Sequence, residues 1–152
     1  MRRTEKAIDD RAAIDAVVRA CRVCRLGMVD GAEPYIVPLC FGYDGEALYF
    51  HCAPEGRKLE ILRRHPRVCF EFDEVEGLLP ADEACRWGIR YRSVMGTGTA
   101  EFLEDPAAKR RAFERIMAQY TPGTFTFPDG AVARTTVLRV RIESLSGKQS
   151  AR

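Results

Sequence analysis

The chain has 152 residues, of which 46% are hydrophobic and 30% are charged, and this size fits one compact domain rather than two. Its 24 Lys and Arg residues nearly balance its 22 Asp and Glu residues. The resulting net charge of +2 argues against a protein built to bind nucleic acid or an anionic membrane surface. No apolar run approaches the roughly 18 residues of a membrane span, and six cysteines are too few for a disulfide scaffold, so we expect one cytoplasmic domain over residues 1–152.

The first half of the chain predicts one helix followed by strands. Asp9 or Asp10 can cap the start of the helix. Its apolar stripe, at helical spacing, consists of Ile14, Val17, Val18 and Cys21. Three apolar runs separated by Asp-Gly turn dipeptides follow at residues 26–29, 35–43 and 47–52. These runs predict an antiparallel meander.

The second half alternates helices with strands. We expect helices over residues 57–64 and 105–120, the latter starting at Asp105-Pro106, and strands over 67–73, 91–103 and 135–143. Residues 74–88 read as an acidic loop that is long enough to serve as a lid. Gly96 and Gly98 mark a bend or bulge in the strand that contains them.

Six short, mainly antiparallel strands interspersed with helices indicate an α+β, mainly β, protein. Two architectures fit this pattern equally: a small barrel capped by helices, and an open six-stranded sheet covered on one face. Pro38 stands inside the run 35–43, and proline cannot donate to a strand ladder. We therefore expect that run to lie at an edge or a bulge.

The residues Arg57 and Lys58 place two cations at the start of a helix, directly after a strand. Unpaired backbone N–H groups at a helix start favour anions, whereas cations there oppose the helix dipole by roughly 0.3 to 1 kcal/mol each. A bound phosphate would offset that cost. The alternative is a solvated surface pair with no ligand.

Two other patterns are weaker. Cys21 and Cys24 have the Cys-x-x-Cys spacing, but no second pair with suitable spacing completes a zinc site. Gly96-Thr97-Gly98 lies inside a strand and does not precede a helix, so it does not predict a dinucleotide-binding turn.

Several segments together resemble a known family. They are Arg25-Leu26-Gly27, Pro34 to Leu39, Tyr49-Phe50-His51, Gly56-Arg57-Lys58, Tyr91 to Val94 with Gly96, and Gly147-Lys148. In order and spacing they are similar to the FMN-binding split barrels of the pyridoxamine 5′-phosphate oxidase-like family, and within it to the nitroimidazole-resistance reductases. The resemblance covers about residues 8–148.

The resemblance implies a six-stranded antiparallel split β-barrel with flanking helices, which forms a homodimer with FMN in clefts between the subunits. Arg57 and Lys58 match the pair that binds the FMN phosphate. The residues that match the strands around the flavin ring are Val37, Pro38, Leu39, Phe50, His51, Ser93 and Val94. Trp87 is expected either to cover the flavin from the partner subunit or to pack in a core or interface.

The implied activity is hydride transfer from reduced flavin to a small-molecule electron acceptor such as a nitro compound, with a nicotinamide donor that binds transiently. His51 is the candidate acid–base residue, and its alternative role is a simple hydrogen bond to the cofactor or backbone. Vitamin B6 oxidation is not expected, because no Arg-containing substrate motif follows Gly147-Lys148. The rival hypotheses are a non-catalytic flavin- or haem-binding protein and a deazaflavin in place of FMN.

Overall fold

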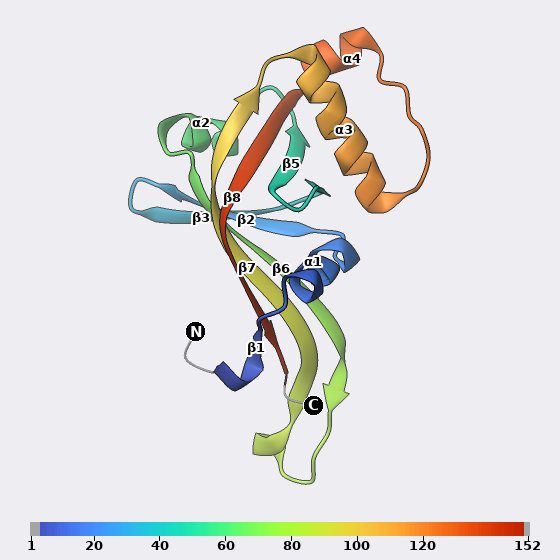
Figure 1. The fold of residues 1–152 in the computed structure, drawn as a ribbon. Helices are drawn as coiled ribbons and strands as arrows, with labels where there is room; N and C mark the ends of the chain where they lie inside the picture. The colour runs from blue at the N-terminus through green and yellow to red at the C-terminus, as the bar shows by residue number, and fades with distance from the viewer. Residues whose placement is uncertain (1–3, 151–152) are drawn as a thin grey trace.

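The structure, a computed structural model, describes residues 4–150, so residues 1–3 and 151–152 of the expected domain lie outside the described part. One long, curved antiparallel sheet forms the body, with helices around it (Figure 1). The strands are β1 (Ala7–Ile8), β2 (Cys24–Asp30), β3 (Glu33–Leu39), β4 (Gly42–Tyr43), β5 (Ala47–Cys52), β6 (Arg67–Leu79), β7 (Gly88–Leu103) and β8 (Thr136–Gln149). The helices are α1 (Arg11–Ala20), α2 (Arg57–Arg64), α3 (Pro106–Tyr120) and α4 (Asp129–Arg134), with short 3-10 turns at Thr4–Lys6 and Ala84–Arg86.

The strand order explains why the sheet curls into a barrel that stays open on one side. The hydrogen-bonded path runs β3-β2-β6-β7-β8-β5-β4, and β1 pairs with β8. The two end strands of this path, β3 and β4, are joined through Cys40 and Phe41 alone. Three Cα steps span at most about 11 Å, so the two ends of the sheet must lie close together although no ladder joins them. The sheet is therefore a split barrel, which decides between the two architectures left open by periodicity.

The barrel interior is filled by aromatic rings. Phe41, Phe70 and Phe72 are almost fully buried, with ring centroids 4.8 Å apart for Phe41 and Phe72 and 6.0 Å apart for Phe70 and Phe72. The helix α2 buries one apolar face against the barrel, and α1 buries another. The buried residues of these two helices are Leu59, Ile61 and Leu62 of α2 and Ile14, Val17 and Val18 of α1.

Local signals in the sequence placed several element boundaries correctly. The Asp10 side chain accepts hydrogen bonds from the first turn of α1, and Asp105 does the same for α3 with Pro106 in the first helical turn. The register of β7 with β8 shifts between Thr97 and Gly98, so the expected bulge is confirmed. β3, which contains Pro38, is an end strand of the sheet path, so the expected edge position is confirmed too.

The prediction of a loop over residues 74–88 was wrong for its first part. β6 continues to Leu79 and β7 begins at Gly88, so only residues 80–87 connect the strands, at the end of a two-stranded hairpin that extends away from the barrel (Figure 1). The acidic side chains do not mark a loop, because Arg92 of the neighbouring strand pairs with Glu74 at 2.6 Å and Glu76 at 3.1 Å. We call residues 73–91 the arm.

Three smaller differences concern short elements. The run 35–43 is divided at Cys40 and Phe41 into β3 and β4, and β1 was not expected, so the described chain has eight strands rather than six. α4 was also missed, because its six residues are too few to show a helical period. β8 runs to Gln149, six residues beyond the expected end.

Candidate functional site

The helix α2 starts with unsatisfied backbone donors. Gly56 precedes it with φ of 137°, a left-handed backbone conformation that favours glycine, and no side chain caps the helix. The N–H groups of Leu59 and Glu60 donate to the Gly56 carbonyl at 2.9 and 3.3 Å. The N–H groups of Arg57 and Lys58 come before the first intrahelical bonds, so they are available to an anion.

The Arg57 side chain is held in place on two sides. Its Nε donates to Asp30 Oδ2 at 3.0 Å, and its guanidinium carbon lies 4.6 Å from the centre of the Tyr35 ring. The Asp30 carboxylate accepts a second hydrogen bond, from Arg64 Nη2 at 2.8 Å. The two Nη groups of Arg57 have no hydrogen-bond or ion-pair partner within residues 4–150, and neither has the Lys58 ammonium. The start of α2 therefore places the two free Nη groups of a restrained Arg57 beside the Lys58 ammonium.

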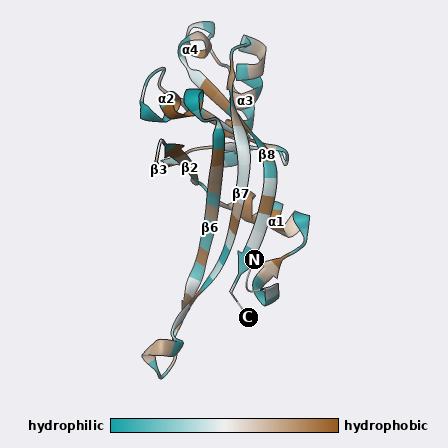
Figure 2. Cartoon of the chain, turned by 90° about the vertical axis from the view of Figure 1, so that its left-hand side faces the viewer, coloured by the Kyte–Doolittle hydropathy of each residue, from teal (hydrophilic) through white to brown (hydrophobic). Residues whose placement is uncertain are grey.

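An apolar groove lies next to this cation pair. It has a volume of about 800 Å³ and includes Tyr35, the residue on which Arg57 stacks. Val29 and Ile36, which also line the groove, are 52% and 63% exposed, and this is unusual for large apolar side chains. Figure 2 shows the β2–β3 hairpin below α2, with hydrophobic residues in brown. We call the surface formed by Gly27, Val29, Tyr35, Ile36, Cys69 and Thr97 the outer groove.

The other strand residues expected around the flavin ring differ in accessibility. Phe50 and Val94 are fully buried in the barrel, so this structure exposes neither residue to a ligand. Pro38 is exposed on the edge strand β3, whereas Val37, Leu39 and Ser93 are half-buried. The contact between Tyr35 and Arg57 therefore brings β3 close to the start of α2, whereas Phe50 and Val94 belong to the hydrophobic core.

His51 lies on a different surface from Arg57. Its side chain is exposed, on the face of β5 opposite to Phe50. It lines an apolar pocket of about 220 Å³ between β5, α3 and α4, together with aromatic side chains such as Phe113 and Phe127. Within the described residues, no hydrogen bond, ion pair or cation–π contact joins His51 to Arg57 or Lys58. The acid–base role of His51 stays a prediction.

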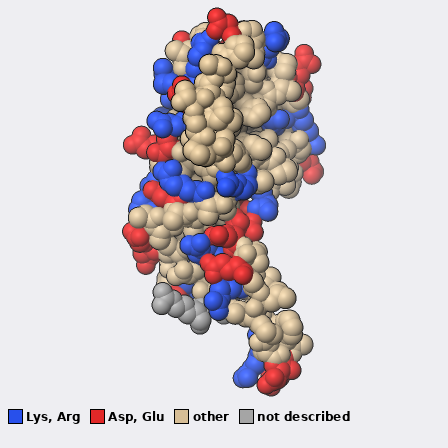
Figure 3. All heavy atoms as spheres, turned by 90° about the vertical axis from the view of Figure 1, so that its right-hand side faces the viewer, with Lys and Arg blue, Asp and Glu red and all other residues tan. Residues whose placement is uncertain are grey.

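Trp87 is at the tip of the arm. Its indole Nε1 donates to the Ala81 carbonyl at 2.7 Å, and the side chain is 53% exposed. The tip of the arm lies at the end of the molecule opposite to α2 (Figure 1), and it stands clear of the barrel in Figure 3. Within one chain Trp87 therefore cannot reach Arg57, so any contact with that site must come from a second copy.

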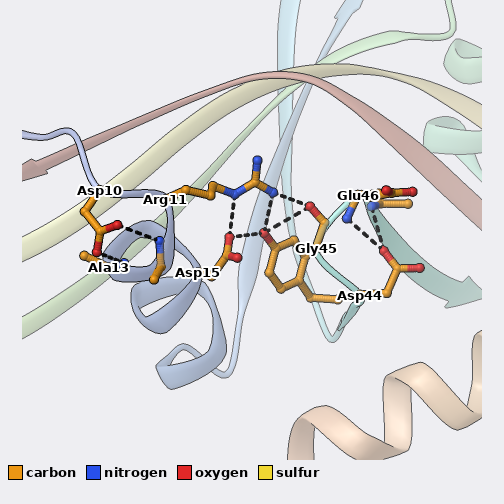
Figure 4. Close-up of polar contacts among 10 residues, drawn as sticks. Asp10, Arg11, Ala13, Asp15, Asp44, Gly45 and Glu46 are labelled. Carbon is orange, nitrogen blue, oxygen red and sulfur yellow. Dashed lines mark hydrogen bonds and ion pairs between the residues drawn. The ribbon is translucent and has the colours of Figure 1, made fainter.

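A charged cleft of about 730 Å³ between α1, the β4–β5 turn and β8 is the main polar site away from α2. In Figure 4, Arg11 donates to Asp15 at 2.8 Å and to the Gly45 carbonyl, and Asp44 accepts from backbone N–H groups of its own turn. The Tyr49 hydroxyl donates to Asp44 at 2.6 Å, and burial together with this carboxylate raises the pKa of Tyr49 to about 12. These polar groups are hydrogen-bond partners of one another, and the network that they form joins α1 to the β4–β5 hairpin.

The Cys-x-x-Cys pair lies in the hydrophobic core. Cys21 and Cys24 are both buried, and burial raises the pKa of Cys21 to about 11 and that of Cys24 further. Both thiols are therefore protonated at neutral pH. No metal-binding group of His, Cys, Asp or Glu side chains occurs within residues 4–150. Over the same residues, no helix is long and apolar enough to span a membrane.

The sequence reasoning missed Asp30 and Tyr35. Asp30 was interpreted only as part of the turn Asp30-Gly31, and Tyr35 as an apolar strand residue. Their contacts with Arg57 join positions more than 20 residues apart, and no local pattern encodes such a pairing. The sequence contains one signal for a contact between this helix and the strands before it. Arg57 and Arg64 stand one and eight residues after Gly56, on a helix that follows the meander.

Comparison with known proteins places the chain in a family. The family model for pyridoxamine 5′-phosphate oxidase matches residues 10–149. An uncharacterized protein of Rhizobium meliloti (strain 1021) is 30% identical over 108 residues, which cover 71% of this chain and 63% of the relative. The chain thus spans less than two thirds of the length of that relative.

Three solved structures are similar to this chain. A candidate 5-nitroimidazole antibiotic resistance protein from Bacteroides thetaiotaomicron has a TM-score of 0.84 at 35% identity, covering 94% of this chain and 86% of its own. An FAD-binding protein from Mesorhizobium loti has a TM-score of 0.69 at 26% identity, covering 96% and 98%. An FAD- and haem-binding protein from Mycobacterium smegmatis, with a TM-score of 0.88 at 22% identity over 97% and 74%, shares the fold. The matched family, the open curled sheet and these similarities agree: the chain belongs to the pyridoxamine 5′-phosphate oxidase family and has its split-barrel fold.

Proposed function

We propose that the chain is a flavoprotein that binds FMN and reduces a small-molecule electron acceptor. The observation that carries this proposal is the start of α2, where Arg57 is fixed by Asp30 and Tyr35 with its Nη groups unpaired, beside Lys58. A phosphomonoester fits this set of donors, because it has the charge and the oxygen atoms to accept several of them. The similar FAD-binding protein supports a flavin as the ligand class.

The chain's own residues would bind and orient the flavin. With the phosphate at Arg57 and Lys58, the β3 backbone around Pro38 and the half-buried Ser93 are candidates to line the ring. When bound, the flavin supplies the hydride chemistry, and the protein supplies position, electrostatics and exclusion of water. No catalytic side chain is required for this role.

We further propose that the protein is a homodimer in which the outer groove is covered by a second copy. Val29, Ile36 and Met95 are each more than half exposed on one side of the sheet, and a large exposed apolar surface of this kind is typical of an interface. Dimerisation would also exclude water from the outer groove, which lies next to Arg57. The arm of the second copy could then bring Trp87 to the flavin.

A nitro compound or quinone is the proposed acceptor, in line with the similarity to the candidate 5-nitroimidazole resistance protein. The donor is proposed to be a nicotinamide that binds transiently. If His51 supplies a proton to the acceptor, then His51→Ala will lower the turnover and change its pH dependence while FMN stays bound. Equal rates at every pH in a flavin-loaded variant would assign His51 a structural role.

A second candidate is a flavin- or haem-binding protein without turnover. It is favoured by the similarity to the FAD-binding protein from Mesorhizobium loti, whose description names a ligand and no reaction. All six cysteines are free thiols, as expected in a reducing cytoplasm, where we propose that either protein functions.

The experiment that tests the proposal is purification without added cofactor, followed by mass spectrometry of the released ligand. FMN and a flavin absorption spectrum are expected, and a Soret band or a deazaflavin mass would identify the rival cofactors. The loaded protein is then mixed with NADH or NADPH and a nitro compound or quinone. Flavin without any turnover would support the binding role, and a protein that neither retains nor takes up flavin would contradict the proposal.

A further inference from the structure

Asp30 occupies a special position relative to Arg57. It is the last residue of β2, yet its carboxylate reaches across to the first residue of α2 and bonds to Nε rather than to the Nη groups. Tyr35 covers the guanidinium plane from β3. The guanidinium is therefore fixed in position and in plane, while its two terminal nitrogens stay unpaired within residues 4–150.

Both oxygens of the Asp30 carboxylate are in use. Oδ2 accepts from Arg57 and Oδ1 accepts from Arg64 at 2.8 Å, and the side chain is only 23% exposed. Two guanidinium groups against one carboxylate leave a net positive charge at this place. The cluster therefore stays attractive to an anion although it contains an acidic residue.

We propose that Asp30 is a positioning residue for the flavin phosphate, and that Tyr35 assists it by fixing the plane of Arg57. This inference rests on the proposed function of the α2 site. Its physical basis is preorganisation: an unrestrained arginine loses much of its rotamer freedom when it binds a ligand, and a restrained one has already lost it. Asp30 therefore strengthens phosphate binding without touching the phosphate.

A purely electrostatic view predicts the opposite sign. If Asp30 acted on the phosphate only through its negative charge, its removal would tighten FMN binding, because like charges repel. Positioning predicts that removal weakens FMN binding. The direction of the change thus distinguishes the two views.

The experiment titrates flavin-free, full-length protein with FMN and with riboflavin, which lacks the phosphate. Asp30→Ala is expected to weaken FMN binding by about 3- to 10-fold and to leave riboflavin binding unchanged. The matched control is Glu33→Ala, because Glu33 lies opposite Asp30 in the β2–β3 pairing and makes no ion pair with a described residue. It removes the same charge and is expected to leave FMN binding unchanged or slightly tighter.

A second pair of variants changes Tyr35 and leaves Asp30 and its turn intact. Tyr35→Phe keeps the ring and should bind FMN like the wild type, whereas Tyr35→Leu should weaken FMN binding by about 2- to 5-fold. Circular dichroism and thermal unfolding show which variants fold. If Asp30→Ala does not fold, equal FMN binding by Tyr35→Leu and Tyr35→Phe would overturn the preorganisation of Arg57 on which the proposal rests.

The outcomes separate this inference from the proposed function. A wild-type chain that does not bind FMN overturns both. Wild-type binding of FMN together with unchanged or tighter binding by Asp30→Ala overturns the positioning role of Asp30 alone. An equal loss of affinity for FMN and riboflavin also overturns it, because the effect would then not act through the phosphate.

Discussion

Ile36→Asp should dissociate the proposed homodimer. Ile36 lies on the outer groove and is 63% exposed in one chain. Full burial of such a side chain contributes about 1.5 to 3 kcal/mol, so covering the exposed part contributes about 1 to 2 kcal/mol. A symmetric interface contains the residue twice, which gives about 2 to 4 kcal/mol. The dimer dissociation constant should rise by about 30-fold to several hundred-fold, and further if the new carboxylate is buried without a partner.

Sedimentation velocity over a range of protein concentrations measures this change. The control is Val23→Asp, because Val23 is 41% exposed but lies in the loop before β2, outside the outer groove. We expect the control to stay dimeric and Ile36→Asp to become monomeric at low micromolar concentration. An Ile36→Asp variant that dimerises like the wild type would refute the assignment of the outer groove as the interface.

Three further predictions concern stability and the arm. Gly42→Ala should lower the free energy of unfolding by about 1 to 3 kcal/mol in urea titrations, because the new Cβ would lie 2.5 Å from backbone atoms of Arg115, and an unchanged midpoint would contradict this packing. Because the folded-state pKa of Tyr49 is raised to about 12 from an ordinary 10, wild-type stability should fall between pH 10 and 12, and Tyr49→Phe should lose less over that range. FMN binding should quench the emission of Trp87, the one tryptophan in the sequence, and emission that does not change when FMN is removed would exclude stacking on the flavin.

Much of the fold was predictable from residues whose structural effect is local. Asp10 and Asp105 cap their helices, Pro38 lies on an edge strand, and a bulge occurs at Gly98, because each of these features depends on a residue and its immediate neighbours. The first part of the loop predicted over residues 74–88 failed for the opposite reason. Glu74 and Glu76 pair with Arg92 on the neighbouring strand, and composition alone cannot show that partner.

The candidate site was predictable only in part. Helix periodicity and Gly56 located Arg57 and Lys58 at the start of α2, and family resemblance predicts that they bind the phosphate. Strand alternation places His51 opposite to Phe50, but only the folded chain shows that residues of α3 and α4 line the pocket beside it. The contact between Asp30 and Arg57 joins two elements 27 residues apart, so only the folded chain reveals it.

The most direct test of the account is a titration of the flavin-free protein with FMN and riboflavin, using the wild type and the double variant Arg57→Gln, Lys58→Gln. Hydrogen bonds to a charged group contribute about 1.5 to 3 kcal/mol each, and Arg57 is 54% exposed, so the lower value applies. The account predicts that the double variant binds FMN at least about 10-fold more weakly than the wild type and binds riboflavin equally well. Equal FMN affinity in the two proteins, or no preference of the wild type for FMN over riboflavin, would contradict a phosphate site at the start of α2.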